Sequence, residues 1–321
     1  MVRIAAAILG LLLWTTAAEA GTVKVGVLKF GTVNWEMDVI RTHGLDREAG
    51  VAVELLELAN GDAIAVALQA GEVDIIVTDW LWVTRQRAEG AGFTFVPFST
   101  SVGALVVAAD SPIADLADLA GKRLGIAGGP VDKNWLVLQA AARRDHDLDL
   151  DAAVDKVFGA PPLLNEQLLS GDLDAVITNW NFVAQLEAQG LKKLIGVEEA
   201  TRELGVATRV PLLGYVFDEV WAAAHKADVL GFVAASRKAK ALLAAGDAEW
   251  ERLRPLMKAK DDATFEALRD GFRRGIPTTW GDAERDDAAR LFALMAEIGG
   301  EDLVGAAKEL VPGTFWADVS Y

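Results

Sequence analysis

Eleven residues of the sequence have the types and the spacing to hold a small molecule without reacting with it. Aromatic rings stack on flat rings and attract ammonium groups. Asn, Asp and Thr side chains hydrogen-bond to polar groups, and a lysine pairs with an anion. These candidate ligand-binding residues are Lys29, Asn34, Trp35, Thr78, Asp79, Trp80, Asn134, Trp135, Thr178, Asn179 and Trp180. They predict a binding site, and no residue is assigned as catalytic or as a metal ligand.

An internal repeat divides most of these residues into two equivalent sets. Residues 68–90 align without a gap with residues 168–190, with eight identities in 23 positions. The dipeptides Asn34-Trp35 and Asn134-Trp135 keep the same offset of one hundred residues. A period of this length is the size of a whole α/β lobe and is too long for a solenoid. We therefore expect two similarly built lobes.

The elements that must position these residues alternate between strands and helices. Hydrophobic alternation predicts strands at 23–28, 51–58 and 73–77, with helices at about 35–43 and 80–89. This order predicts an α/β fold in which each lobe is a mostly parallel sheet flanked by helices. Further strands are expected at Phe95, 104–108, 123–126, 154–157 and 175–177, and helices after Val216. Ligands of such sheets bind beyond the carboxyl ends of the strands, so two facing lobes would form a cleft.

Each candidate also has a plainer explanation. Asn and Asp at the start of a helix can cap its free backbone N–H groups, and a tryptophan in the first turn can belong to the core. Because the same tryptophan recurs at the same turn in both halves, we expect a shared cleft to use it. The expectation is that at least three of four residues line the site: Trp35, Trp80, Trp135 and Trp180.

Composition and motifs exclude several classes of function. The chain has 31 basic and 47 acidic residues, a formal charge of −16, which argues against a nucleic-acid partner. It has no cysteine, so disulfides, thiolate nucleophiles and iron–sulfur clusters are ruled out. The sequence contains no nucleophile elbow, zincin helix or Walker loop. We expect neither an enzyme nor a cofactor, with His43, His146 and His225 as ordinary surface residues.

The first twenty residues have the pattern of a secretory signal peptide. Arg3 precedes an apolar run at 4–14, and Ala18-Glu19-Ala20 is a small-x-small cleavage site. A signal anchor is the alternative. No later segment approaches the length of apolar sequence that a membrane helix needs, so no direct membrane insertion is expected. The prediction is an exported, periplasmic protein.

Several motifs resemble one family. Residues 103–126 resemble the second-lobe segment of periplasmic solute-binding proteins of ABC importers. Residues 25–32, 71–76 and 311–316 are similar to the branch that binds nitrate, sulfonates, taurine and thiamine precursors. The resemblance covers the chain after residue 20 and implies a two-lobe type II periplasmic binding fold that closes on a small-molecule ligand. It also implies a membrane partner, the ABC permease.

The resemblance implies a division of the chain as well. Residues 1–20 are the signal peptide, 21–102 the first part of lobe 1, 103–210 lobe 2, and 211–321 the return to lobe 1 with extra C-terminal helices. The two crossovers are placed near 99–103 and 208–212, and the helices after Val216 are expected to pack back on the first lobe. A monomer is expected.

The candidate residues leave the ligand's charge open. Asp79 is acidic where the second half has neutral Asn179, which favours a small nitrogen-containing solute, aromatic or cationic. Helix N-termini and Lys29 favour the alternative, an oxyanion such as nitrate, a sulfonate or taurine. A thiamine-pyrimidine-synthase-like enzyme is a further possibility, although that family depends on Cys and His near iron. A ligand-sensing domain for a signalling partner also fits the same residues.

Overall fold

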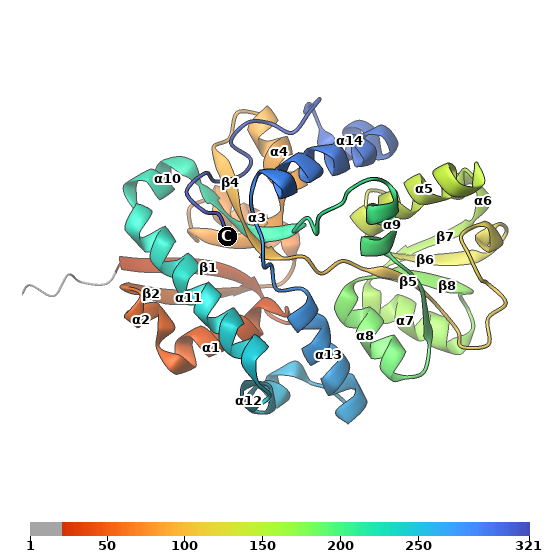
Figure 1. Cartoon of the computed structure of the whole chain (residues 1–321), viewed down its shortest axis with the longest axis horizontal. Helices are drawn as coiled ribbons and strands as arrows, with labels where there is room; N and C mark the ends of the chain where they lie inside the picture. Colours follow the sequence, from red (N-terminus) through yellow and green to blue (C-terminus); the bar gives the residue numbers. More distant parts are fainter. Residues whose placement is uncertain (1–20) are drawn as a thin grey trace, which may run out of the picture.

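The computed structural model describes residues 21–321 as two α/β lobes joined side by side (Figure 1). The predicted signal peptide at 1–20 lies outside the described residues. Among the residues that are described, no helix combines the length and the apolar character needed to cross a membrane.

The first lobe is built on five strands in the order β2-β1-β3-β10-β4. β1 pairs in parallel with β2 and β3, whereas β10 is antiparallel to both β3 and β4. The strands are β1 (Gly21–Leu28), β2 (Val51–Leu58), β3 (Ile75–Asp79), β4 (Phe93–Ser99) and β10 (Leu213–Asp218).

The second lobe repeats this plan in the order β7-β6-β8-β5-β9. β6 is parallel to β7 and β8, and β5 is antiparallel to β8 and β9. Its strands are β5 (Ala104–Val107), β6 (Arg123–Ala127), β7 (Asp155–Gly159), β8 (Ala175–Thr178) and β9 (Lys192–Gly196). With one strand order in both sheets, the sequence repeat corresponds to a structural repeat, and the predicted two-lobe α/β fold is confirmed.

The sheets are mixed, however, because β5 and β10 each follow a connection between the lobes rather than a strand–helix–strand unit. They therefore enter their sheets in the opposite direction to their neighbours. β9 and β10 are not among the predicted strands, because their short runs lack clear alternation.

The helices of the two lobes also correspond. The first lobe has α1 (Val33–His43), α2 (Leu45–Glu48), α3 (Gly61–Gln69) and α4 (Trp80–Ala88). The second has η1 (Ala117–Leu119), α5 (Lys133–His146), α6 (Leu150–Ala153), α7 (Pro161–Ser170), α8 (Trp180–Ala188) and α9 (Val197–Glu203). In both lobes a long helix follows the central parallel strand, so α1 corresponds to α5 and α4 to α8.

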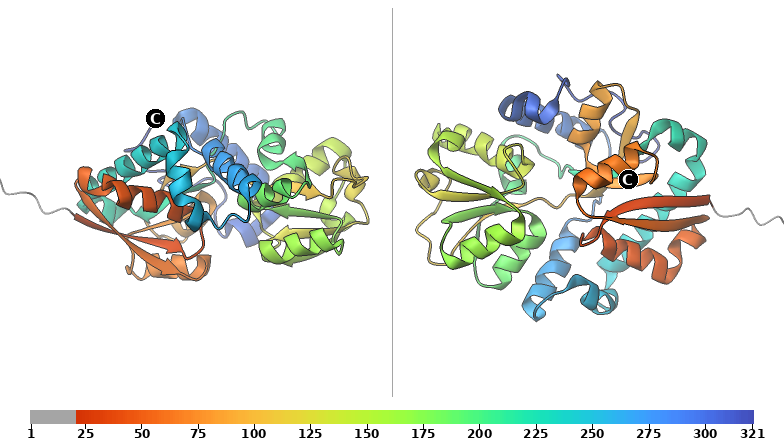
Figure 2. Two further views of the ribbon diagram at one scale, coloured as in Figure 1. Left: turned by 90° about the horizontal axis from the view of Figure 1, so that it is seen from below. Right: turned by 180° about the vertical axis from the view of Figure 1, so that it is seen from behind.

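The C-terminal helices contact both lobes. They are α10 (Glu219–Ala224), α11 (Lys226–Ala245), α12 (Ala248–Met257), α13 (Asp262–Arg274) and α14 (Asp282–Val304). α11 packs on α1 and α2, as expected for helices that return to the first lobe. α13 packs along α8, and α14 packs on α5 as well as α4, so these two bridge the lobes (Figure 2). The C-terminal helices thus return to the first lobe, and α13 and α14 contact the second lobe as well.

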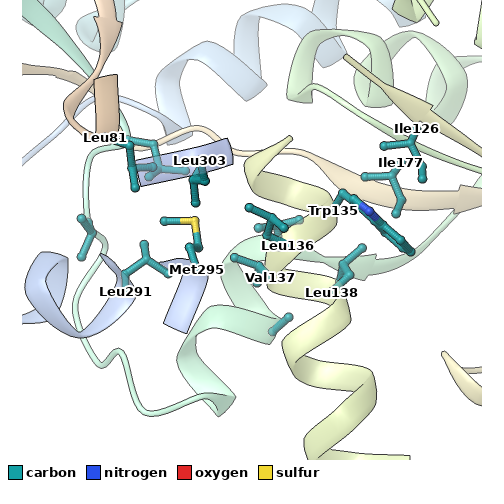
Figure 3. Close-up of a cluster of buried hydrophobic side chains, with 14 of the residues drawn as sticks. Leu81, Ile126, Trp135, Leu136, Val137, Leu138, Ile177, Leu291, Met295 and Leu303 are labelled. Atoms are coloured by element: carbon teal, nitrogen blue, oxygen red, sulfur yellow. The ribbon is translucent and has the colours of Figure 1, made fainter. Parts of the chain in front are cut away.

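An apolar core lies between these bridging elements. Leu81 of α4, Met295 and Leu303 of α14 and Leu136 of α5 are buried together (Figure 3). On the other side of α5, the ring of Trp135 lies against the second sheet. Burying each such side chain stabilises the folded state by roughly 1.5–3 kcal/mol relative to leaving it exposed. Because α14 buries side chains against helices of both lobes, it stabilises both.

A charged pair is buried inside the first lobe. Lys240 of α11 binds Glu36 of α1, and Tyr215 of β10 donates its hydroxyl to the same carboxylate. The ammonium group also contacts Ser236, at 3.0 Å. Burial lowers the pKa of Lys240, against the attraction of Glu36. Removing either Glu36 or Lys240 would leave the other as an unpaired buried charge, which would destabilise the fold.

Candidate interlobe binding site

A cavity of about 420 Å³ lies between the two lobes. Lobe 1 supplies the ends of β1 and β3 and the start of α1, and lobe 2 supplies the starts of α5 and α8. Residues 101–103 and 212–213, from the two connections between the lobes, complete the wall. This is the edge at which ligands bind in open α/β sheets, because the strand-to-helix turns collect there.

Four helices begin at this cavity, and they differ in how their N-termini are capped. Asp79 caps α4 by accepting the backbone N–H of Trp82, and Asp132 caps α5 in the same way. Thr32 and Asn179 precede α1 and α8 without a side-chain cap. In these first turns Asn34, Trp35 and Phe182 already donate their backbone N–H groups to carbonyls. An acceptor on a ligand is offered the N–H groups at the very start of each helix, those of Val33, Trp180 and Asn181.

An ion pair crosses the cavity. The Nζ of Lys133, at the start of α5, lies 2.8 Å from the Oδ2 of Asp79, at the end of β3. The attraction of Asp79 raises the pKa of Lys133, although burial opposes it. Burial raises the pKa of Asp132, against its bond to the α5 backbone and the charge of Lys133. Both oxygens of Asp79 thus have partners within the protein.

Five of the eleven predicted residues line this cavity: Thr78, Asp79, Asn134, Asn179 and Trp180. Asn134 is buried, and its Oδ1 accepts the backbone N–H of Gly103 at 2.8 Å, which ties α5 to the first connection between the lobes. Its Nδ2 lies 3.5 Å from the Oδ1 of Asn179. The predicted pair of asparagines therefore belongs to one wall.

Three more predicted residues line an adjoining cavity of about 340 Å³: Lys29, Asn34 and Trp35. Asn34 donates its amide to the carbonyl of Leu28 at 2.8 Å, so it braces the turn after β1. Trp35 is 5% exposed and packs edge-on against Trp180 of the other lobe, with ring centres 6.3 Å apart. This aromatic contact is a second link across the interlobe gap.

The structure does not bring the last three predicted residues to either cavity: Trp80, Trp135 and Thr178 are fully buried. Trp80 packs against Phe315 near the C-terminus, and Trp135 packs in the second lobe (Figure 3). Only Trp180 of the four tryptophans lines the interlobe cavity. The recurrence of tryptophan at equivalent positions is therefore explained mainly by similar core packing in the two lobes.

Several lining residues were not predicted, and Lys133 is the most important of them. The sequence does contain a signal for this residue. Asp is a favoured N-cap, so Asp132 marks the start of a helix and places Lys133 in its first turn. The aromatic residues Phe30, Phe98 and Phe182 also line the cavity. Of these, only Phe182 lies within the repeat, opposite Trp82. None of the three histidines lines the cavity.

Within residues 21–321, no three His, Cys, Asp or Glu side chains are grouped so that they could hold a metal ion. His43 lies 2.9 Å from Glu249, and His225 lies 3.2 Å from Asp228 and stacks on Trp221. The polar groups around the cavity are suited to hydrogen bonding and ion pairing with a solute.

Comparison with solved structures shows that this fold is similar to that of periplasmic binding proteins. The aliphatic sulfonate binding protein SsuA of Escherichia coli superposes with a TM-score of 0.72 at 18% identity, over 92% of both chains. The alkanesulfonate-binding SsuA of Xanthomonas axonopodis pv. citri, solved with bound MOPS, gives 0.68 at 18% identity, over 94% of this chain and 99% of that one. A Candida albicans protein with the generic periplasmic binding protein fold gives 0.59 at 12% identity, over 88% and 93%.

The family follows from the sequence itself. The model of the NMT1/THI5-like family matches residues 39–248, more than half of the chain. The chain therefore belongs to the NMT1/THI5-like family. Comparison with curated proteins gives no sequence match.

Proposed function

We propose that the protein is the extracytoplasmic solute receptor of an ABC import system and that it binds a small organic oxyanion, such as a sulfonate, between its lobes. The periplasmic location and the permease partner are part of this proposal. The two SsuA proteins with the same fold bind sulfonates, and the groups that line the cavity here are consistent with such a ligand.

The observation that carries the proposal is the state of Asp79. The sequence-based preference for a cationic solute depended on this carboxylate, but its Oδ1 accepts from Trp82 and its Oδ2 accepts from Lys133. The donors offered to a ligand are the remaining N–H groups of Lys133 and backbone N–H groups in the first turns of α1 and α8, which have no side-chain cap. Asp132, the other carboxylate in the lining, caps α5 and lies next to Lys133 in the chain. Donors at helix N-termini favour an anion.

The apolar part of the wall suits an organic body attached to the anionic group. Leu28, Phe30, Val77, Phe98 and Phe182 line the cavity together with the polar residues. Contacts with both lobes form only when the lobes are closed, so a ligand that makes both sets stabilises the closed form.

A binding screen of the purified protein tests the proposal. We expect thermal stabilisation by alkanesulfonates and no stabilisation by alkylammonium ions or uncharged pyrimidines, with isothermal titration calorimetry giving the dissociation constants. Stabilisation by ammonium ions alone would contradict the anion assignment. Stabilisation by a pyrimidine, with turnover of that compound, would favour a synthase.

A further inference from the structure

The outer cavity is the adjoining space of about 340 Å³ that Lys29 lines, and it shares part of its wall with the interlobe cavity. Phe30, Gly31, Thr32, Asn181 and Phe182 line both spaces. The two cavities therefore meet at the first turns of α1 and α8. A solute that occupied both spaces would pass along these shared residues, of which Phe30 and Phe182 are the aromatic ones.

Phe30 stands at this junction with two lysine ammonium groups near its ring. Its side chain is 77% exposed, although it is a large apolar group. The Nζ of Lys258 lies 4.3 Å from the centre of its ring, and the Nζ of Lys29 lies 5.7 Å from it. Both ammonium groups are thus gathered around one exposed ring, where each is attracted to the ring and still lines the outer cavity.

The backbone holds both lysines in place. Asn34 braces the turn that contains Lys29 through its bonds to the carbonyls of Leu28 and Lys29. Lys258 ends α12 in the left-handed region, with φ of 53°. This conformation is uncommon for a residue with a side chain. It turns the chain at the end of the helix, and Lys258 reaches Phe30 from there.

The charge of the outer cavity is opposite to that of the protein as a whole. Lys29 and Lys258 are among its lining residues, and Glu57 is the acidic one. The complete chain has a formal charge of −16. A local excess of positive charge on an acidic protein marks a place suited to an anion.

We infer that the outer cavity is a second anion subsite, and that the solute carries two acidic groups separated by a short apolar spacer. This inference rests on the proposed function, because the first acidic group occupies the interlobe cavity. The spacer lies against Phe30 and Phe182, and the second acidic group pairs with Lys258 and Lys29. The substrate class is therefore an elongated organic dianion, such as a sulfonate that also carries a carboxylate.

Matched pairs of ligands test this inference by isothermal titration calorimetry. Each ω-sulfocarboxylate in a series of increasing chain length is compared with the alkanesulfonate of the same carbon number. We expect an optimum length at which the dianion binds about tenfold more tightly, the effect of one hydrogen bond to a charged group. Lys258→Gln should reduce this preference to about twofold or less, in line with the loss of that bond. Lys260→Gln, an exposed lysine outside the outer cavity, is the control and should retain the preference.

The outcomes separate the two proposals. If alkanesulfonates bind and no dianion in the series binds better than its partner, the second subsite is refuted and the proposed function stands. The second subsite is also refuted if Lys258→Gln weakens both members of a pair equally. If neither class of compound binds, the proposed function fails, and the inference fails with it.

Discussion

Asp79 and Lys133 belong to facing lobes, and their side chains meet at 2.8 Å across the interlobe cavity. Asp79 also caps α4, and Lys133 follows the cap of α5. The pair thus joins the N-termini of two helices as well as two lobes. An anionic solute and Asp79 would compete for the same ammonium group.

That competition predicts opposite effects for two substitutions. Lys133→Gln should weaken binding of butane-1-sulfonate about tenfold, through the loss of a hydrogen bond to a charged group. Asp79→Asn should keep the helix cap, because Asn caps as well as Asp, and should strengthen binding by freeing Lys133. Calorimetry measures both, with Lys156→Gln as the control because Lys156 pairs with Asp151 outside the cavity. Equal weakening by both variants would contradict the competition.

Trp180 should contribute to binding through its position at the cavity wall. Its ring packs on Trp35 and Phe272 of the first lobe. Trp180→Ala is expected to weaken binding of an aryl sulfonate by about 1–3 kcal/mol through lost packing and stacking. Calorimetry with benzenesulfonate measures this, and Trp221→Phe, which lies outside the cavity, should have no effect. An unchanged dissociation constant for Trp180→Ala would remove this residue from the site.

Gly103 should tolerate no side chain. A Cβ at this position would lie 2.1 Å from the carbonyl oxygen of Thr178. Because a backbone atom of β8 cannot move aside, Gly103→Ala should lower the free energy of unfolding by about 1–3 kcal/mol or more. Gly129→Ala is the matched control, with nothing within 4 Å of its added Cβ. Urea unfolding compares the two variants, and equal midpoints would contradict the steric argument.

The buried pair of Glu36 and Lys240 should be strongly coupled. Lys240→Met leaves the Glu36 carboxylate buried without its counter-ion and should destabilise the protein by about 3–5 kcal/mol. The double variant Glu36→Gln with Lys240→Met should recover part of that loss, because the remaining amide carries no charge. Urea unfolding of the single and double variants measures the coupling. If the double variant loses as much as the two single variants together, the pair is not coupled.

Much of the architecture could be predicted from the sequence, and the binding site only partly. The one-hundred-residue repeat predicts two lobes, and both sheets have the same strand order. The mixed direction of the strands could not be predicted from local alternation, because pairing direction depends on where the chain re-enters each sheet. Thr78, Asp79, Asn134, Asn179 and Trp180 line the cavity, and each stands where a strand ends or the following helix begins, a position that the sequence pattern indicated.

The tryptophans show where the sequence stops being informative. Trp80 and Trp180 stand at equivalent positions of the repeat, yet the first is fully buried and the second lines the cavity. The residues that make the difference come from the C-terminal segment, which has no counterpart in the repeat. Phe315 packs against Trp80, whereas α13 packs beside Trp180 and leaves part of its ring open.

The sequence by itself determined the repeated α/β plan, the absence of cysteine chemistry and the polar turns at the strand ends, because these follow from local patterns and composition. Only the tertiary structure decided which side chains line the interlobe cavity and what charge they present. Asp79 is a free carboxylate in the sequence and a bound partner of Lys133 in the folded protein. The physical reason is that a side chain's role depends on its neighbours from distant segments, and those neighbours are set by how the lobes and the C-terminal helices pack.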